Sequence, residues 1–263
     1  MGIFVNHCHV FPRGCFNKDK PKLGTPDDLL GLLKRLGIDG AVVFAPFEYK
    51  VRMDPNEWLS EALPEGANLI GFATINPVKR NSIRKLEKAI DMGLKGIKIH
   101  PPIMKFRIND DRAEAFYSLA EEYRLPLVFH TGVHGWLLRN YVPILLDDVA
   151  QAHPDLPIII EHIGGAEFYQ EALAVLRNNE NMYAGITSTL QPEDEWHIPL
   201  KDITKLIRVI GAHRIIYGTD YPYRLEGEIE EDLKIIRGLK MTPEDEERIL
   251  GGNLRRILEE VRV

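Results

Sequence analysis

The chain has 263 residues, of which 44% are hydrophobic and 27% are charged, and its formal net charge is −6. Ordinary apolar content with a small net charge excludes a disordered chain, and no apolar run reaches the roughly 18 residues of a membrane span. The mildly acidic balance gives no electrostatic footprint for nucleic-acid binding.

The cysteine count and the N-terminal residues indicate the cellular compartment of the protein. The sequence has 2 cysteines, Cys8 and Cys15, which excludes a disulfide scaffold and predicts reduced thiols of a cytoplasmic protein. No basic leader precedes the first apolar stretch, so we expect no signal peptide. Scarce Gln beside abundant Lys, Arg and Glu is typical of thermophilic proteins.

Short β-branched runs alternate with longer stretches of helical period along the whole chain. The predicted strands are Ile3–His7, Ala41–Pro46, Ile70–Asn76, Gly96–His100, Pro126–Gly132, Pro157–Gly164, Met182–Ser188 and Arg214–Asp220. The predicted helices are Thr25–Leu36, Pro55–Leu63, Ser82–Met92, Asp111–Tyr123, Tyr141–Ala152, Ala166–Asn178, Leu200–Ile210, Glu226–Gly238, Thr242–Leu250 and Asn253–Val261.

Strands that alternate with helices predict a parallel sheet. Several strands are apolar on both faces, and the length suits eight βα units closed into a barrel of ~250 residues. The alternative, a doubly wound open sheet, calls for a Gly-rich phosphate turn after its first strand, and none is present. We therefore predict an α/β fold, a single-domain (β/α)8 TIM barrel over residues 1–263 with an extra C-terminal helix pair.

Chemistry in such a barrel gathers at the C-terminal ends of the strands. The first strand ends in His7-Cys8-His9, and residues two apart on a strand share a face. Both imidazoles can then bind one metal ion while Cys8 points into packing. The fourth strand ends with Lys98 and His100 on one face, and a lysine inside a barrel must be paired, neutral or chemically used.

Three further strands end in His130, His162 and Asp220. A single strand-end His is usually structural, but here five of the eight predicted strands end in a metal-capable side chain on one face. The pattern predicts a divalent ion that acidifies water and polarises a carbonyl. Asp220 suits proton transfer from the attacking water, and His162 suits polarising the substrate oxygen or shuttling a proton.

These motifs, taken in order, resemble those of the amidohydrolase superfamily: HCH, FHTG, EHIGG and GTDYP after the first, fifth, sixth and eighth strands. The closing GGNLRRIL resembles the GGNxxRLL tail of the amidohydrolase-related branch, which includes the aminocarboxymuconate semialdehyde and hydroxybenzoate decarboxylases. The resemblance covers the whole chain.

The resemblance implies that His7, His9, His130 and Asp220 are metal ligands. It implies that His162 is either a catalytic histidine beside one metal or a ligand to a second. Lys98 falls where dinuclear members such as dihydroorotases carry a carboxylated bridging lysine. One ion is favoured over two, with zinc expected and manganese, iron, cobalt and nickel as alternatives.

The expected activity is metal-dependent hydrolysis of an amide, lactone or related bond in a small, carboxylate-bearing substrate. The alternatives are a metal-dependent non-oxidative decarboxylase or hydratase on the same site, and a binding barrel without activity. The candidate substrate contacts are His100, His134, Arg139 and Tyr221, with Arg13, Lys105, Arg107, Trp136, Tyr223 and Arg224 as further candidates in nearby loops. We expect a small-molecule partner, no nucleic acid or membrane, and the homo-oligomers that are common in the family.

Overall fold

A computed structural model describes residues 2–263 and contains one sheet of eight strands in the order β1 to β8. The strands are β1 (Ile3–His9), β2 (Ile38–Phe44), β3 (Leu69–Thr74), β4 (Ile97–Ile99), β5 (Leu127–His130), β6 (Ile158–Glu161), β7 (Met182–Gly185) and β8 (Ile215–Ile216). Neighbouring strands pair in parallel, and a parallel bridge between Asn6 and Gly218 joins the end of β8 to β1. The predicted eight-stranded βα barrel is confirmed.

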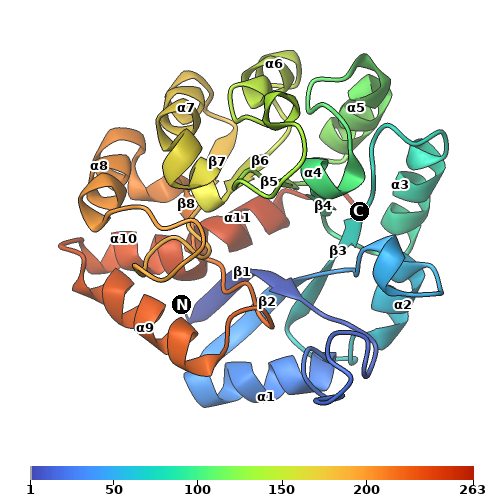
Figure 1. Ribbon diagram of the computed structural model, residues 1–263, viewed down its shortest axis with the longest axis horizontal. Coiled ribbons are helices and arrows are strands. Elements are labelled where there is room, and N and C mark those ends of the chain that lie inside the picture. Colours follow the sequence, from blue (N-terminus) through green and yellow to red (C-terminus); the bar gives the residue numbers. More distant parts are fainter. Residues whose placement is uncertain (1) are drawn as a thin grey trace.

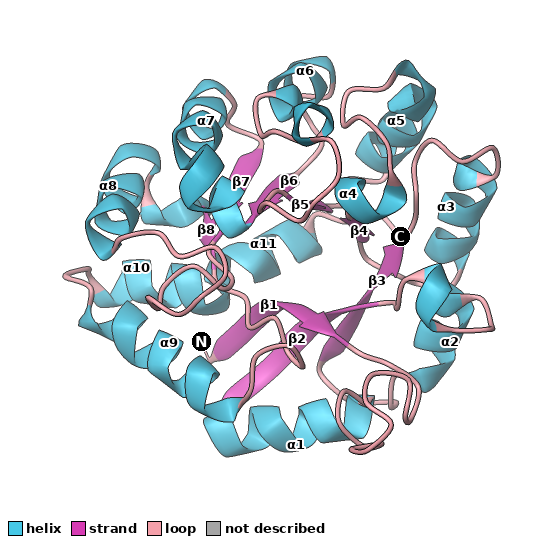
Figure 2. Ribbon diagram, in the orientation of Figure 1, coloured by secondary structure: helices cyan, strands magenta, loops and turns pink. Residues whose placement is uncertain are grey.

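Most of the helices form a ring outside the strands (Figures 1 and 2). The helices of residues 2–263 are α1 (Pro26–Leu36), α2 (Pro55–Ala62), α3 (Ser82–Asp91), α4 (Pro101–Met104), α5 (Glu114–Glu122), α6 (Leu145–Ala152), α7 (Gly165–Asn178), α8 (Leu200–Ile210), α9 (Glu226–Gly238), α10 (Pro243–Glu247) and α11 (Asn253–Glu259). Across residues 2–263, none of these helices combines the length and apolar character needed to cross a membrane.

Helices α6 and α10 depart from the predicted helix boundaries for local reasons. Helix α6 begins at Leu145 instead of Tyr141, because Pro143 disfavours the helical conformation in the residue before it. The predicted helix Thr242–Leu250 is interrupted after α10 by a π-helical turn in which Gly251 has a φ of 156°. A residue with a side chain rarely adopts that backbone conformation.

The apolar residues divide into an inner and an outer core. The inner core lies inside the barrel and consists of Phe4, Val42, Phe44, Phe72, Val128, Ile159, Tyr183, Ile216, Leu254 and Ile257. Its last two members come from α11, which lies behind the barrel in Figure 1 near the N-terminal ends of the strands. The C-terminal helix therefore closes the bottom of the barrel with apolar side chains, and the polar strand ends remain at the top.

We expect Leu254→Ala to lower the free energy of unfolding by about 2–5 kcal/mol, because Leu254 is fully buried and its truncation leaves a cavity. Leu200→Ala is the matched control, since Leu200 is 39% exposed on α8. That change is expected to stay within about 0.5 kcal/mol. Urea unfolding followed by circular dichroism measures both, and equal losses in the two variants would contradict the role given to α11.

Candidate functional site

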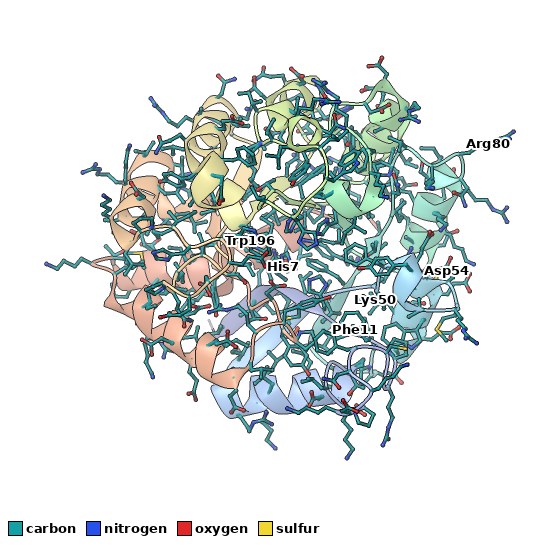
Figure 3. All side chains as sticks on the ribbon, viewed as in Figure 1. His7, Phe11, Lys50, Asp54, Arg80 and Trp196 are labelled. Carbon is teal, nitrogen blue, oxygen red and sulfur yellow. The ribbon has the colours of Figure 1, made fainter. Side chains whose placement is uncertain are left out.

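A pocket of about 290 Å³ opens at the C-terminal end of the barrel. Its polar lining residues are His7, His9, Lys50, Lys98, His100, His130, His134, His162, Glu195 and Asp220. Its other lining residues are Phe47, Tyr49, Ile103, Trp196 and Tyr223. Figure 3 shows His7 and Trp196 near the centre of the barrel. The strand ends predicted from the sequence thus meet in one pocket.

A β-bulge in β1 turns His7 into this pocket. Val5 pairs with Ala41 and Cys8 with Val43, so β1 contains one residue more than β2 over this stretch. The extra residue places His7 at a φ of 59°. Cys8 consequently packs, as predicted, into the outer core, the larger cluster of buried apolar residues that includes Val5, Ala41 and Val43. His7 and His9 both line the pocket. The two-residue spacing predicted that His7 and His9 share a face, and the bulge turns that face toward the pocket.

His7, His9 and Asp220 form a buried group whose candidate ligand atoms all lie within 4.8 Å of one another. The Nε2 atoms of His7 and His9 lie 3.6 and 3.3 Å from Asp220 Oδ1. Burial lowers the pKa of His9 to about 4, against the opposing hydrogen bond to Asp220, so its imidazole is neutral near pH 7. Neutral imidazole and carboxylate are the forms that bind metals.

The Asp220 carboxylate is held on both sides. Its Oδ2 accepts a hydrogen bond from Ser188 Oγ at 3.2 Å, while its other oxygen faces the two imidazoles. Burial alone would raise the pKa of Asp220, but the hydrogen bond to His9 and the nearby histidines lower it far below its usual value. The side chain is therefore ionised throughout the neutral range.

His130 lies in the pocket with a second group. Its candidate ligand atom lies within 4.8 Å of those of His100 and His134, and His130 is not a member of the group formed by His7, His9 and Asp220. The rings of His100 and His130 stack with centroids 3.9 Å apart, and His130 Nε2 is buried with no hydrogen-bond partner among residues 2–263. The role of His130 as a fourth ligand stays a prediction.

Glu161 is a buried site residue to which the sequence reasoning gave no role. It is fully buried, lies 2.7 Å from His7 Nδ1, and accepts a hydrogen bond from Asn6 Nδ2. Burial opposes ionisation, but the charge and hydrogen bonding of His7 lower the pKa of Glu161 to about 2. A carboxylate at Nδ1 orients the ring and leaves Nε2 free for a ligand. The available signal was a lone acid inside the apolar run IIIEHI.

Lys98 lies inside the barrel beside the same histidine. Its Nζ is 3.2 Å from His7 Nε2, and burial lowers its pKa to about 8 while Glu161 and Asp220 oppose that shift. The two carboxylates compensate a buried positive charge that would otherwise be costly. A bridging role between two metals stays a prediction.

His162 has a defined tautomer in its neutral form. Its Nδ1 lies 2.9 Å from the Thr187 carbonyl oxygen, which can only accept, so the proton is on Nδ1 and Nε2 is an acceptor. Burial, with the neighbouring His7, lowers the pKa of His162 to about 3. The ring packs against Trp196 with centroids 3.8 Å apart, and Trp196 Nε1 donates to the Val133 carbonyl at 3.3 Å. Trp196 carried no sequence signal, because no strand or helix pattern places its loop over the pocket.

Only two of the four main predicted substrate contacts line the pocket. His100 and His134 line the pocket, whereas Tyr221 and Arg139 do not. The Tyr221 hydroxyl points away toward α1, where it donates to Asp28 and accepts from the Gly24 amide at 3.0 Å. Tyr223, two residues further on, lines the pocket instead.

The residues present fit a divalent cation. Two imidazole donors and one ionised carboxylate converge, and His130 contributes a buried nitrogen for which residues 2–263 supply no hydrogen-bond partner. The positive φ angles of His7, His162, Ser188 and Asp220 add evidence. Each costs about 1–3 kcal/mol and is typical of binding or catalytic sites.

Comparisons with known proteins indicate the family and the fold. A model of the amidohydrolase family matches residues 8–259. An uncharacterised TIM-barrel protein from Bordetella bronchiseptica superposes with a TM-score of 0.80 at 17% identity, covering 99% of each chain.

Two decarboxylases have the same fold. The 2,6-dihydroxybenzoate decarboxylase from Rhizobium gives a TM-score of 0.76 at 14% identity, covering 98% of this chain and 99% of that one. The dihydroxybenzoic acid decarboxylase from Polaromonas sp. JS666, solved with manganese and 2-nitroresorcinol, gives 0.74 at 14% identity, covering 98% and 97%.

We expect Glu161→Gln to weaken binding of Zn²⁺ about 10–100-fold, because the amide holds the His7 ring less firmly and makes it less basic. Glu195→Gln is the control, since Glu195 lines the pocket but lies outside the ligand group. Competition with a fluorescent zinc chelator measures both affinities. Equal affinity in the wild type and Glu161→Gln would contradict the positioning role of Glu161.

Proposed function

The chain belongs to the amidohydrolase family, and from this premise we propose that it is a metal-dependent hydrolase of an amide, lactone or related bond in a small, carboxylate-bearing substrate. One observation carries the proposal: His7, His9 and Asp220 converge inside a pocket at the active end of the barrel. The pocket is of a size for a small molecule.

His7, His9 and Asp220 would hold the metal, and His130 lies beside them as the expected fourth ligand. When bound, a divalent cation supplies a Lewis acid that polarises a carbonyl and acidifies water. Zinc suits imidazole and carboxylate ligands. Manganese is supported as an alternative by its presence in the Polaromonas structure.

The chain's own groups supply proton transfer and orientation. Asp220, ionised and held by Ser188, accepts the proton of the attacking water. Neutral His162 presents Nε2 as an acceptor, so it orients a hydroxyl or water instead of donating to the substrate oxygen. Lys98 adds a positive charge at the bottom of the pocket, where it attracts a substrate carboxylate.

A second candidate function is non-oxidative decarboxylation on the same site. The observation that favours it is the fold shared with the Rhizobium and Polaromonas decarboxylases over almost the whole chain. The two reactions differ in their products: decarboxylation releases CO2, and hydrolysis leaves a new carboxylate with an amine or alcohol.

Elemental analysis of protein purified without chelator is expected to find about one divalent ion per chain. His9→Ala should lose most of it, and Lys98→Met should keep it, because a single ion needs no bridging lysine. His213→Ala is the control, since His213 is exposed in the turn before β8 and outside the pocket. Wild-type metal content in His9→Ala would contradict the ligand assignment.

Asp220→Asn is expected to lower turnover roughly 10²–10⁴-fold at saturating metal, since the amide cannot accept the proton. A panel of lactones, amides and hydroxybenzoates, assayed for both new carboxylate and CO2, provides the measurement. Release of CO2 in proportion to substrate consumed would select the decarboxylase, and undiminished turnover in the variant would contradict the role of Asp220.

A further inference from the structure

A second cavity of about 480 Å³ adjoins the site pocket. Loops that follow β2, β3 and β4 form it, so it opens on the same end of the barrel. The two cavities share Phe47, Tyr49 and Ile103 in their linings. A ligand long enough to pass these three side chains would occupy both.

Two basic side chains in the lining of the second cavity are not neutralised by an acidic neighbour in the described part of the chain. Its lining includes Lys79, Lys105 and Arg112. Arg112 pairs with Asp110, and the acidic residue of the lining, Glu48, is engaged by Lys85. Within residues 2–263, no hydrogen-bond or ion-pair partner is found for the side chains of Lys79 and Lys105.

This local charge differs from that of the whole chain, whose formal net charge is −6. Two free ammonium groups beside a concave surface attract an anion, and the attraction weakens as salt screens it. Single exposed lysines contribute little to binding, so the expected effect is the combined effect of both.

The wall between the cavities is apolar and aromatic. The rings of Phe47 and Tyr49 lie nearly parallel with centroids 5.9 Å apart. The rings of Phe47 and His100 are nearly perpendicular, with centroids 5.5 Å apart. Val78 and Met104 line the second cavity beyond them. This lining suits an apolar or aromatic body between two polar ends.

We propose that the second cavity binds the anionic tail of an elongated substrate that carries a second carboxylate. The reacting end lies among the histidines of the site pocket, the apolar body passes Phe47 and Tyr49, and the distal carboxylate lies between Lys79 and Lys105. This inference rests on the proposed function, because it takes the histidine pocket as the reacting end.

Titration calorimetry with two probes tests the inference: biphenyl-4-carboxylate and biphenyl-4,4′-dicarboxylate. The wild type is expected to bind the dicarboxylate about tenfold more tightly, as two ion pairs contribute. Lys79→Gln/Lys105→Gln should abolish that preference and leave the affinity for the monocarboxylate unchanged. Raising the salt concentration should reduce the preference in the wild type.

Lys201→Gln/Lys205→Gln is the matched control, because it removes the same charge from exposed positions on α8. It should keep the preference. Equal affinity of the wild type for the two probes would overturn the inference, and so would an equal loss of preference in the control.

The outcome is separable from that of the proposed function, because the probes are bound and not turned over. A wild type that prefers the dicarboxylate but contains no metal on elemental analysis would support the cavity and contradict the metal enzyme. A wild type with metal and no preference would contradict the cavity alone.

Discussion

Two buried carboxylates compensate the charge of the polar side chains that are buried at the C-terminal end of the barrel. Glu161 and Asp220 face a lysine and several imidazoles in a region from which water is largely excluded. Burying those groups without opposite charge would cost several kcal/mol per ion. Glu161 contacts Nδ1 of His7 and so orients its ring, while Asp220 lies near the Nε2 atoms of both His7 and His9. The same contacts therefore balance the charge and direct the ligand atoms.

The barrel divides stability and chemistry along its axis. At the N-terminal ends of the strands, Leu254 and Ile257 of α11 complete an apolar core. At the other end the backbone is strained, with positive φ at His7, His162 and Asp220. The tightly packed lower half supplies the free energy that keeps the strained residues in place.

The sequence predicted most of the architecture because periodicity and turn residues are local signals. The bounds of α8 and α9, and the presence and order of the eight strands, follow from such signals. The bulge in β1 does not, because it depends on the pairing of Val5 and Cys8 with a strand distant in sequence. Strand alternation without the bulge would have turned Cys8 inward.

The candidate site was predictable as a set of strand-end residues but not in its details. Which residue after Asp220 faces the pocket depends on a backbone turn, so Tyr223 took the place expected for Tyr221. The contact of Glu161 with His7 joins two distant strands. Trp196 comes from a loop whose course only tertiary packing against His162 and the Val133 carbonyl determines.

The account depends on a cation bound among side chains that come from opposite ends of the chain. Anomalous scattering at the zinc edge, recorded from crystals of zinc-loaded protein, tests this most directly. The account predicts a peak within coordination distance of His7 Nε2, His9 Nε2 and Asp220 Oδ1. A peak bounded only by His100 and His134, or no peak inside the barrel, would contradict it.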